Sequence, residues 1–481
     1  MKETTATFTR TRLQTDAFKA LANHDWMAAT DHLAMALIEN PNWADGWLNI
    51  GLARLHLHQP QSAILALQRG IDLDPDRPRA RCTLAEAWLQ AGDLEEAAEA
   101  GRDECRRFPD LADNWLSLGR TLEQMEHPEA GNAYDRAHHL APENPDTSWH
   151  WARWLNEHHE VDAAYRLLEI ARARHPDSAQ LEWQFAGNCF YREDWIRGFN
   201  HMDCRSRLPD FPRGPATEGV PLWQPGTQPR SPILLEPEQG LGDTIQFIRF
   251  IPELARRGHR VWLGCPKPLR TLLEGFPGVD RLLTNTGEAA GAGCRLPLMS
   301  LPARLSWAPN VTEHQPYITG EHVRSQTDTN KKEYPYRIGW ALSGNPDHLN
   351  DKNRSLKSEA LSNFKLPQNI KVFRVQPNTQ TSIHLPFQIQ DPEIELVDFS
   401  ATARWIATLK LIITVDTSIA HLAGGMGIPV WILLPYVPDW RWSIHSNRTH
   451  WYKSAYLFRQ KHARNWQSVM QQIQNKLETL S

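Results

Sequence analysis

Small side chains recur along residues 10–207 with a period of 33 or 34 positions, and prolines keep the same phase. The members of these series are Ala29, Ala63, Ala97, Ala130 and Ala164; Ala36, Gly70, Ala137 and Ala171; and Pro41, Pro75, Pro109, Pro142 and Pro176. A repeat of this length is typical of stacked helix pairs, in which small residues allow two helices to cross closely. We therefore predict an α-helical solenoid over residues 10–207.

These units resemble the tetratricopeptide repeat, which consists of two antiparallel helices. Aromatic residues open several units, as at Trp47 and Trp115, each followed by a glycine four positions later. Five units are recognisable, and a sixth, degenerate one extends through Gly198. Glu104 departs from the pattern, because a small residue is expected at its position in the second helix. The resemblance implies a solenoid surface that recruits a protein partner.

The pattern changes after residue 207. Residues 208–230 are rich in proline and glycine and are predicted to form a linker. Beyond them, short apolar runs alternate with stretches of helical character, which predicts parallel α/β layers. The expected strands are 232–236, 261–263, 336–340, 371–375, 411–415 and 430–434, and the expected helices are 244–257, 268–274 and 463–480. A polar interval at 321–333 divides this part into two predicted α/β domains, 231–330 and 331–481.

Composition narrows the function classes. A chain of 481 residues is too long for one core, and a net charge of −4 without a basic tail argues against nucleic acid or an anionic membrane as partner. The six cysteines form no C-x-x-C pair, which argues against a zinc site and a disulfide framework. The polar start lacks a signal peptide, and the longest apolar runs have the length of strands. We therefore expect a cytoplasmic protein without a membrane span.

The first motif is residues 238–244 (EQGLGDT), which follow a predicted strand and open a predicted helix. Open α/β sheets bind ligands at this place, and Gly240 and Gly242 would let the backbone approach a ligand closely. The alternative is a tight turn in which Asp243 caps the helix.

The second motif runs from Ile412 to Gly424. A buried strand ends in Asp416, Thr417 and Ser418, and a helix rich in small residues follows. Hydroxyl groups together with the amides at a helix start suit a phosphate. His421 lies four residues after Thr417, so both can share one helix face. The alternative is a capped helix with a packed histidine.

The third motif is a polar loop after the strand expected at 336–340. It contains Ser343 and Asn345, and then two cations, Lys352 and Arg354, which could neutralise a diphosphate. The alternative is a solvated loop.

Together, the three motifs resemble glycosyltransferases of the heptosyltransferase kind (family 9), in the subgroup with N-terminal tetratricopeptide repeats. The resemblance covers residues 231–460. It rests on Gly242 and Asp243 with Pro252 following, on the run from Asp416 to Ala423, and on residues 435–442 (PYVPDWRW). It implies the GT-B architecture: two Rossmann-like domains facing across a cleft, with the acceptor on the side of 231–330 and the nucleotide-sugar on the side of 331–481.

The resemblance also implies the roles of individual residues. Asp243 would be the general base that deprotonates the acceptor hydroxyl, and direct displacement would invert the anomeric carbon. Lys352 would neutralise the leaving diphosphate, with Arg354 as the competing candidate. The implied donor-binding residues are Gly240, Gly242, Ser343, Asn345, Arg354, Gln376, Asp416, Thr417, Ser418, His421, Trp440 and Trp442. The donor would be a nucleotide-diphosphate sugar and the acceptor a glycan or a protein. No cofactor or metal is expected, because this half has no Asp-x-Asp motif.

Some features depart from the family pattern. Asp416 is followed by Thr-Ser, where the family usually has Thr-Gly, the first α/β domain is short, and the loops that bind a lipopolysaccharide acceptor are not recognisable. These departures leave the expected fold unchanged but leave the donor sugar and the acceptor open. Two alternative functions also stay open: a protein O-glycosyltransferase of the repeat-bearing Ser/Thr type, and a non-catalytic repeat scaffold with a degenerate transferase domain.

Tryptophan is abundant, with 20 residues against 9 tyrosines. Trp47, Trp88 and Trp115 are expected to fill the crossings of helix pairs in the repeats. Trp149, Trp151 and Trp154 lie close together in the fifth unit, where one or two of the rings must point outward. Trp440 and Trp442 flank Arg441, and their rings either stack on the nucleotide or sugar or pack in the protein.

Overall fold

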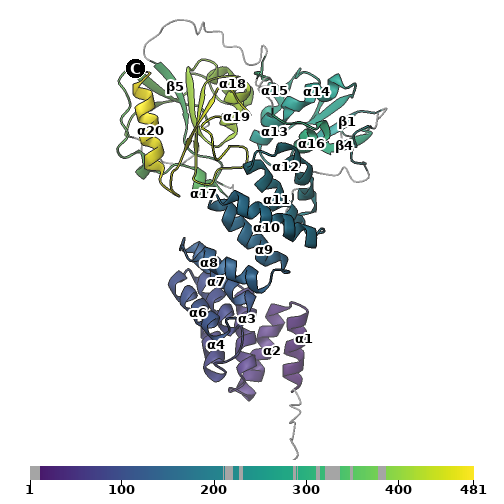
Figure 1. The fold of residues 1–481 in the computed structure, drawn as a ribbon, viewed down its shortest axis with the longest axis vertical. Helices are drawn as coiled ribbons and strands as arrows, with labels where there is room; N and C mark the ends of the chain where they lie inside the picture. The colour runs from purple at the N-terminus through teal and green to yellow at the C-terminus, as the bar shows by residue number, and fades with distance from the viewer. Residues whose placement is uncertain are drawn as a thin grey trace, which may run out of the picture. The chain divides into compact units, whose positions relative to one another are not determined.

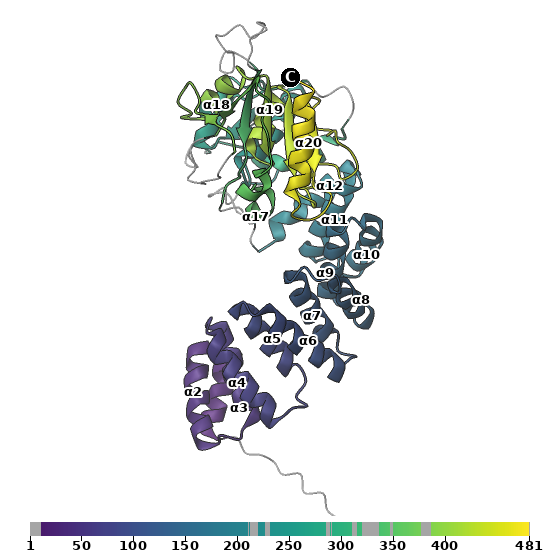
Figure 2. The same cartoon turned by 90° about the vertical axis from the view of Figure 1, so that its left-hand side faces the viewer.

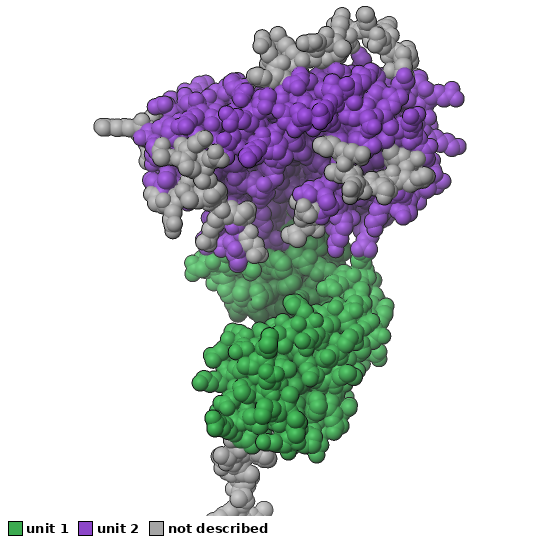
Figure 3. Space-filling model, turned by 180° about the vertical axis from the view of Figure 1, so that it is seen from behind, with its two compact units in different colours: residues 1–181 green, residues 182–481 purple. Residues whose placement is uncertain are grey.

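The computed structural model describes residues 11–480 except for several intervals. These are 210, 212–219, 227–230, 285–288, 290, 310–314, 320–335, 347–349 and 377–385. Most of the predicted linker and the polar interval at 321–333 therefore lie outside the described residues. The chain divides into two compact units, residues 1–181 and 182–481, which Figure 3 colours separately.

The first unit consists of antiparallel helix pairs, as predicted (Figures 1 and 2). The five pairs are α1 (Arg12–Ala22) with α2 (Trp26–Glu39), α3 (Ala44–His56) with α4 (Pro60–Leu73), α5 (Ala80–Ala91) with α6 (Leu94–Arg107), α7 (Ala112–Gln124) with α8 (Ala130–Leu140), and α9 (Pro145–Glu157) with α10 (Val161–Arg174). All the periodic alanines from Ala29 to Ala164 are buried, which confirms their role at the helix crossings.

The periodic prolines and aromatic residues act together. The indole nitrogens of Trp47 and Trp115 donate hydrogen bonds of 2.8 Å to the carbonyl oxygens of Pro41 and Pro109, six residues earlier. Arg81, at the equivalent position of the repeat between them, donates to the Pro75 carbonyl at 2.7 Å. Each side chain thus stabilises the turn that precedes its own helix, because a backbone carbonyl at a helix end otherwise lacks a partner.

Glu104, the departure from the repeat pattern, has a structural role. Its side chain is fully buried (0% exposed), and it accepts a hydrogen bond from the backbone N–H of Arg79. Arg79 has a left-handed backbone (φ 68°) at the start of α5, where no side chain of the same turn caps the helix. Burial raises the pKa of Glu104, although Arg81 lies 3.9 Å away. The carboxyl group replaces a small residue because it satisfies this amide.

The described residues of the second unit form two parallel sheets (Figure 1). The first has the strand order β3-β2-β1-β4, formed by β1 (Ile233–Glu236), β2 (Val261–Gly264), β3 (Arg281–Leu283) and β4 (Cys294–Pro297). The second has the order β10-β9-β8-β5-β6-β7, formed by β5 (Tyr336–Ala341), β6 (Ile370–Arg374), β7 (Ile389–Gln390), β8 (Leu411–Val415), β9 (Val430–Leu434) and β10 (Ala455–Arg459). This is the strand order of a doubly wound, Rossmann-type sheet.

Helices connect and cover these strands. They are α13 (Leu241–Phe247), α14 (Ile251–Arg256), α15 (Arg270–Leu273), α16 (Leu301–Leu305), α17 (Asp351–Arg354), α18 (Phe399–Ile406), α19 (Ser418–Gly425) and α20 (Trp466–Glu478). The expected helix at 244–257 is broken, because a 3-10 turn at Ile248–Phe250 separates α13 from α14. The expected C-terminal helix is confirmed as α20, whose apolar face packs on the second sheet through Val469, Ile473 and their neighbours.

The sixth helix pair, α11 (Ala179–Tyr191) and α12 (Trp195–Met202), differs from the others. We predicted a solenoid that extends to residue 207, whereas the compact units divide at 181/182, within α11. Phe190, Trp195 and Phe199 belong to one hydrophobic core with Trp451 and the strands of the first sheet. Large aromatic rings on this pair therefore join it to the α/β unit.

Candidate functional site

The three sequence motifs follow central strands of the two sheets. The chain order of the second sheet reverses between β5 and β8, which are neighbours with Ala341 paired to Thr414. Ser343 and Asp416 each lie two residues beyond this pair, at the carboxyl ends of their strands. Open α/β sheets bind ligands at such a switch point, outside the carboxyl ends of the strands.

The motif after β1 meets the motif after β8 through direct contact of α13 with α19. A Cβ atom on Gly242 would lie 2.9 Å from Cδ2 of His421 and 3.4 Å from Cα of Ser418. A side chain at position 242 would therefore force the two helices apart. The glycine predicted to admit a ligand instead admits a neighbouring helix.

Arg441 contacts several side chains next to the junction, which is the place where α13 meets α19. Its guanidinium forms an ion pair with Asp243 Oδ1 and donates hydrogen bonds of 2.8 Å each to Gln246 Oε1 and Asp439 Oδ1. Asp243 Oδ2 accepts a 2.8 Å hydrogen bond from the backbone N–H of Gly240, so the carboxylate also caps α13. Arg441 is only 6% exposed. Asp243 is therefore the cap of α13, the alternative interpretation of the first motif, and its other carboxylate oxygen is held in an ion pair with Arg441.

Burial shifts the protonation of the acidic groups. Removal from water raises the pKa of Asp243, while the nearby Arg441 charge opposes this rise. Burial and the neighbouring Asp439 carboxylate raise the pKa of Asp416 to about 7. Three carboxylates therefore share this region with the two guanidiniums of Arg441 and Arg354.

The predicted phosphate-binding residues are arranged around the start of α19. Thr417 occupies the N-cap position, but its hydroxyl lies 3.0 Å from Thr414 Oγ1 and does not cap the helix. Ser418 is the first helical residue and is half-buried. The start of α19 therefore keeps backbone amides that the Thr417 side chain does not occupy.

His421 is a packed histidine, the alternative interpretation of the second motif. It is 5% exposed, its Nδ1 lies 2.8 Å from the Tyr452 hydroxyl, and its ring stacks on Trp442 with centroids 5.4 Å apart. Burial lowers its pKa well below the usual value, so the imidazole is neutral at pH 7. These contacts give it a role in holding α19 against its neighbours.

The third motif places one cation at the site and the other in solvent. Arg354 pairs with Asp351 at 3.2 Å and donates to the backbone carbonyl oxygen of Asp416 at 3.1 Å. Lys352, which we predicted to neutralise the diphosphate, is exposed on α17. The geometry therefore favours Arg354, the competing candidate.

Ser343, Asn345 and Gln376 lie in the same region of the second sheet. Ser343 is buried, and its carbonyl oxygen accepts a 3.3 Å hydrogen bond from Gln376 Nε2. Gln376 Oε1 is buried and, among the described residues, has no hydrogen-bond partner. Asn345 is exposed. Gln376 thus presents an unpaired acceptor close to the end of β5.

The two tryptophans that flank Arg441 pack within the protein. Trp442 is fully buried (0% exposed) against His421 and Tyr452. Trp440 stacks on Phe190 of α11, with centroids 4.2 Å apart and an interplanar angle of 24°. The structure thus supports the packing interpretation over stacking on a ligand. Sequence reasoning missed Arg441, Gln246 and Asp439, although an arginine between two tryptophans was a visible signal.

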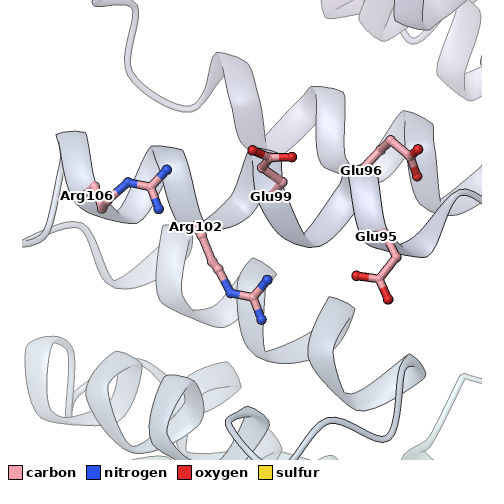
Figure 4. A pocket seen from close by; sticks show the side chains of 5 residues that line it. All are labelled: Glu95, Glu96, Glu99, Arg102 and Arg106. Atoms are coloured by element: carbon pink, nitrogen blue, oxygen red, sulfur yellow. The ribbon is translucent and has the colours of Figure 1, made fainter.

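A surface pocket of about 340 Å³ lies apart from these motifs, on α6 of the first unit (Figure 4). Glu95, Glu96, Glu99, Arg102 and Arg106 line it, all from one helix. Within the described ranges, no group of three or more His, Cys, Asp or Glu side chains is arranged to hold a metal ion. Of the described helices, none is long and apolar enough to cross a membrane.

Comparison with known proteins agrees with the helix pairs of the first unit. A sequence model of the tetratricopeptide repeat matches residues 48–112, which contain most of α3 and all of α4 to α6. The N-terminal region is built of tetratricopeptide repeats. The human PEX5-related protein is 26% identical over 94 residues, which are 20% of this chain and only 15% of the length of that protein.

Solved structures similar to part of this chain include several proteins of low sequence identity. MamA is 20% identical, with a TM-score of 0.31 over 33% of this chain and 94% of its own. The pilF protein of Pseudomonas aeruginosa is 16% identical, with a TM-score of 0.36 over 41% of this chain and 90% of its own. Yeast Tom70 is 17% identical, with a TM-score of 0.36 over 41% of this chain and 44% of its own.

Proposed function

We propose that residues 182–481 form an inverting, metal-independent glycosyltransferase of the GT-B, family 9-like kind. It would transfer a sugar from a nucleotide-diphosphate donor to a glycan or protein acceptor. The observation that carries the proposal is the convergence of three motifs at the carboxyl-end edge of β1, β5 and β8: Asp416 directly follows β8, Asp243 lies on α13 after β1, and Arg354 of α17 donates to the Asp416 carbonyl oxygen. A parallel sheet binds its ligand at this edge.

In the proposed reaction, an oxygen of Asp243 takes the proton of the acceptor hydroxyl. The freed oxygen attacks the anomeric carbon while the bond to the diphosphate breaks, which inverts the configuration at that carbon. Burial raises the pKa of Asp243. A carboxylate with a raised pKa is a stronger base than an exposed carboxylate, because its pKa is closer to neutral pH.

The leaving diphosphate needs positive charge. Arg354 lies against Asp416 and supplies a guanidinium with several donors, whereas Lys352 is exposed. Ser418 and the amides at the start of α19 would bind the phosphate oxygens. Gln376 would offer its unpaired Oε1 to a hydroxyl or amino group of the donor.

The repeats would recruit the acceptor or a protein partner. Repeat solenoids present a long continuous surface, and ion pairs on the surface of this one connect successive repeats, such as Arg79 with Asp113 at 3.2 Å. The test compares the full chain with residues 178–481. Transfer to a large acceptor should fall when the repeats are removed, while transfer to a short acceptor fragment stays unchanged.

A second candidate function is a non-catalytic scaffold with a degenerate transferase domain. The observation that favours it is the ion pair of Asp243 with Arg441, which occupies one carboxylate oxygen. A protein O-glycosyltransferase of the repeat-bearing Ser/Thr type remains the alternative within the enzyme class, and a peptide acceptor distinguishes it from a glycan transferase.

Thermal-shift measurements against a panel of nucleotide-sugars test the proposal first, because a ligand that binds only the folded state raises the unfolding midpoint. Transfer from the donor found in this way is then followed by NMR of the anomeric proton. The proposal predicts a product of inverted configuration without added metal. Donor binding with no transfer to any acceptor supports the scaffold, and a retained configuration contradicts the proposed mechanism.

A further inference from the structure

We infer that Arg441 is the positioning residue of Asp243, holding this carboxylate charged and oriented. The inference rests on the proposed function, in which Asp243 is the general base. Arg441 and Asp243 are 198 residues apart, on the two sides of the junction between the sheets, and the ion pair is nearly buried. No step of the proposed reaction assigns Arg441 a role, although it contacts the base directly.

The contacts of Arg441 fix the guanidinium from several directions. Nε donates to Gln246 Oε1 and Nη1 donates to Asp439 Oδ1, each at 2.8 Å, which leaves Nη2 directed at Asp243. The guanidinium also lies over the Trp440 ring, 4.3 Å from its centroid. A planar group held on several donors and one face has little freedom to turn, so the Asp243 oxygen that it contacts is fixed as well.

The segment that carries Arg441 is held by the sixth helix pair. The Tyr191 hydroxyl donates to the Pro438 carbonyl at 2.9 Å, and the Ser443 hydroxyl donates to Glu193 at 2.8 Å. Between these two contacts, Trp440 stacks on Phe190. Residues 438–443 are therefore anchored on both sides of Arg441, and the degenerate repeat acquires a function: it holds the residue that orients the base.

Charge gives Arg441 a second effect on the base. Its proximity lowers the pKa of Asp243, against the rise that burial causes. A base acts only when it is deprotonated, so removal of Arg441 should raise the pH below which the reaction slows. Replacement by lysine keeps the charge but loses the fork of donors, so that variant should lose rate without this change in pH dependence.

The experiment measures rate against pH for the full-length chain and for R441M, R441K and R249M. Arg249 is the control, because it is a nearby arginine with a different environment: it donates to the Trp451 carbonyl at 3.0 Å and lies over the Tyr317 ring, and within the described part of the chain it does not contact Asp243. We expect R441M to transfer sugar at least 10-fold more slowly at neutral pH, and the acidic limb of its pH profile, where the rate falls at low pH, to move to higher pH by about one unit. R441K should also be slower, but with the same acidic limb as the wild-type chain. R249M should have the acidic limb of the wild-type chain.

Two outcomes separate the inference from the proposed function. An R441M variant that is folded and active with an unchanged acidic limb overturns the inference and leaves the proposed function standing. Absence of transfer by the wild-type chain with every donor that binds overturns both. Should R441M fail to fold, the comparison of R441K with R249M decides, because equal rates in these two variants contradict a positioning role.

Discussion

Arg354 donates a 3.1 Å hydrogen bond to the backbone carbonyl oxygen of Asp416, and so connects the loop after β5 with the end of β8. Lys352, two residues away on the same short helix, is exposed. The two cations are close in sequence but differ in environment. This difference provides a matched pair of substitutions.

We predict that R354M weakens binding of a nucleoside diphosphate about 10- to 100-fold, because a charge-assisted hydrogen bond to phosphate is lost. K352M should weaken it less than about 3-fold, and that small effect should shrink further at high salt, because the charge of Lys352 is screened by solvent. Calorimetric titration at two salt concentrations measures both. A larger loss for K352M would restore the original prediction that Lys352 contacts the diphosphate.

Gly242 offers a test of the contact between α13 and α19. We predict that G242A lowers the free energy of unfolding by about 1–3 kcal/mol, because a Cβ would lie 2.9 Å from the His421 ring. Gly187 on α11 is the control, since a Cβ there meets no atom of the described residues within 4 Å, and G187A should stabilise by about 0.5–1 kcal/mol. Denaturant unfolding of the α/β unit measures both, and equal stability of the two variants would contradict the packing described.

From the buried carboxyl group of Glu104 we predict that the stability of the repeats depends on pH. Burial raises the pKa of this carboxyl group in the folded state, so the folded chain binds more protons than the unfolded chain just above the ordinary pKa of 4.5. Stability should therefore fall as pH rises through this window. E104Q removes this effect and keeps an acceptor for Arg79, so it should raise the unfolding midpoint of the repeats at pH 7 but not at pH 4.

The companion variant E104A should be destabilised by about 1–3 kcal/mol, since the backbone N–H of Arg79 loses its acceptor. Thermal unfolding followed by circular dichroism compares the two variants. A stabilised E104A would show that the carboxyl group has no part in holding the turn before α5.

The division of the chain at 181/182 predicts how it can be shortened. A chain of residues 178–481 keeps α11 and α12 and should unfold in one cooperative transition. A chain of residues 208–481, cut at the boundary expected from the repeats, would expose Trp440 and Trp451, which pack on Phe190 and Trp195. It should aggregate or show the red-shifted tryptophan fluorescence of solvent-exposed rings. Equal behaviour of the two fragments would contradict the shared core.

The repeats and the central strands were predictable because each produces a local pattern. The period of the alanines located the helix pairs, and the strands expected at 411–415 and 430–434 are β8 and β9 with the same limits. The strands β3, β4, β7 and β10 were missed, because they are short or carry polar residues at the sheet edges.

The candidate site was only partly predictable. Asp243 and Asp416 follow apolar strands, a signal that sequence alone contains. The partner of Asp243 lies 198 residues away, and no spacing rule connects Asp243 with Arg441. Nor does the sequence pattern show that α19 packs against Gly242, or that Trp440 stacks on Phe190 of the degenerate repeat. These features depend on how the two sheets and the sixth helix pair pack.

The most direct test of the central claim compares donor binding and sugar transfer in the wild-type chain and in D243N. Asparagine keeps the size of the side chain and an oxygen toward Arg441, but it cannot accept the proton of the acceptor. The account predicts that transfer falls by about 100-fold or more while the affinity for the nucleotide-sugar stays within about 3-fold. Full activity of D243N, or an equal loss of binding and transfer, would contradict it.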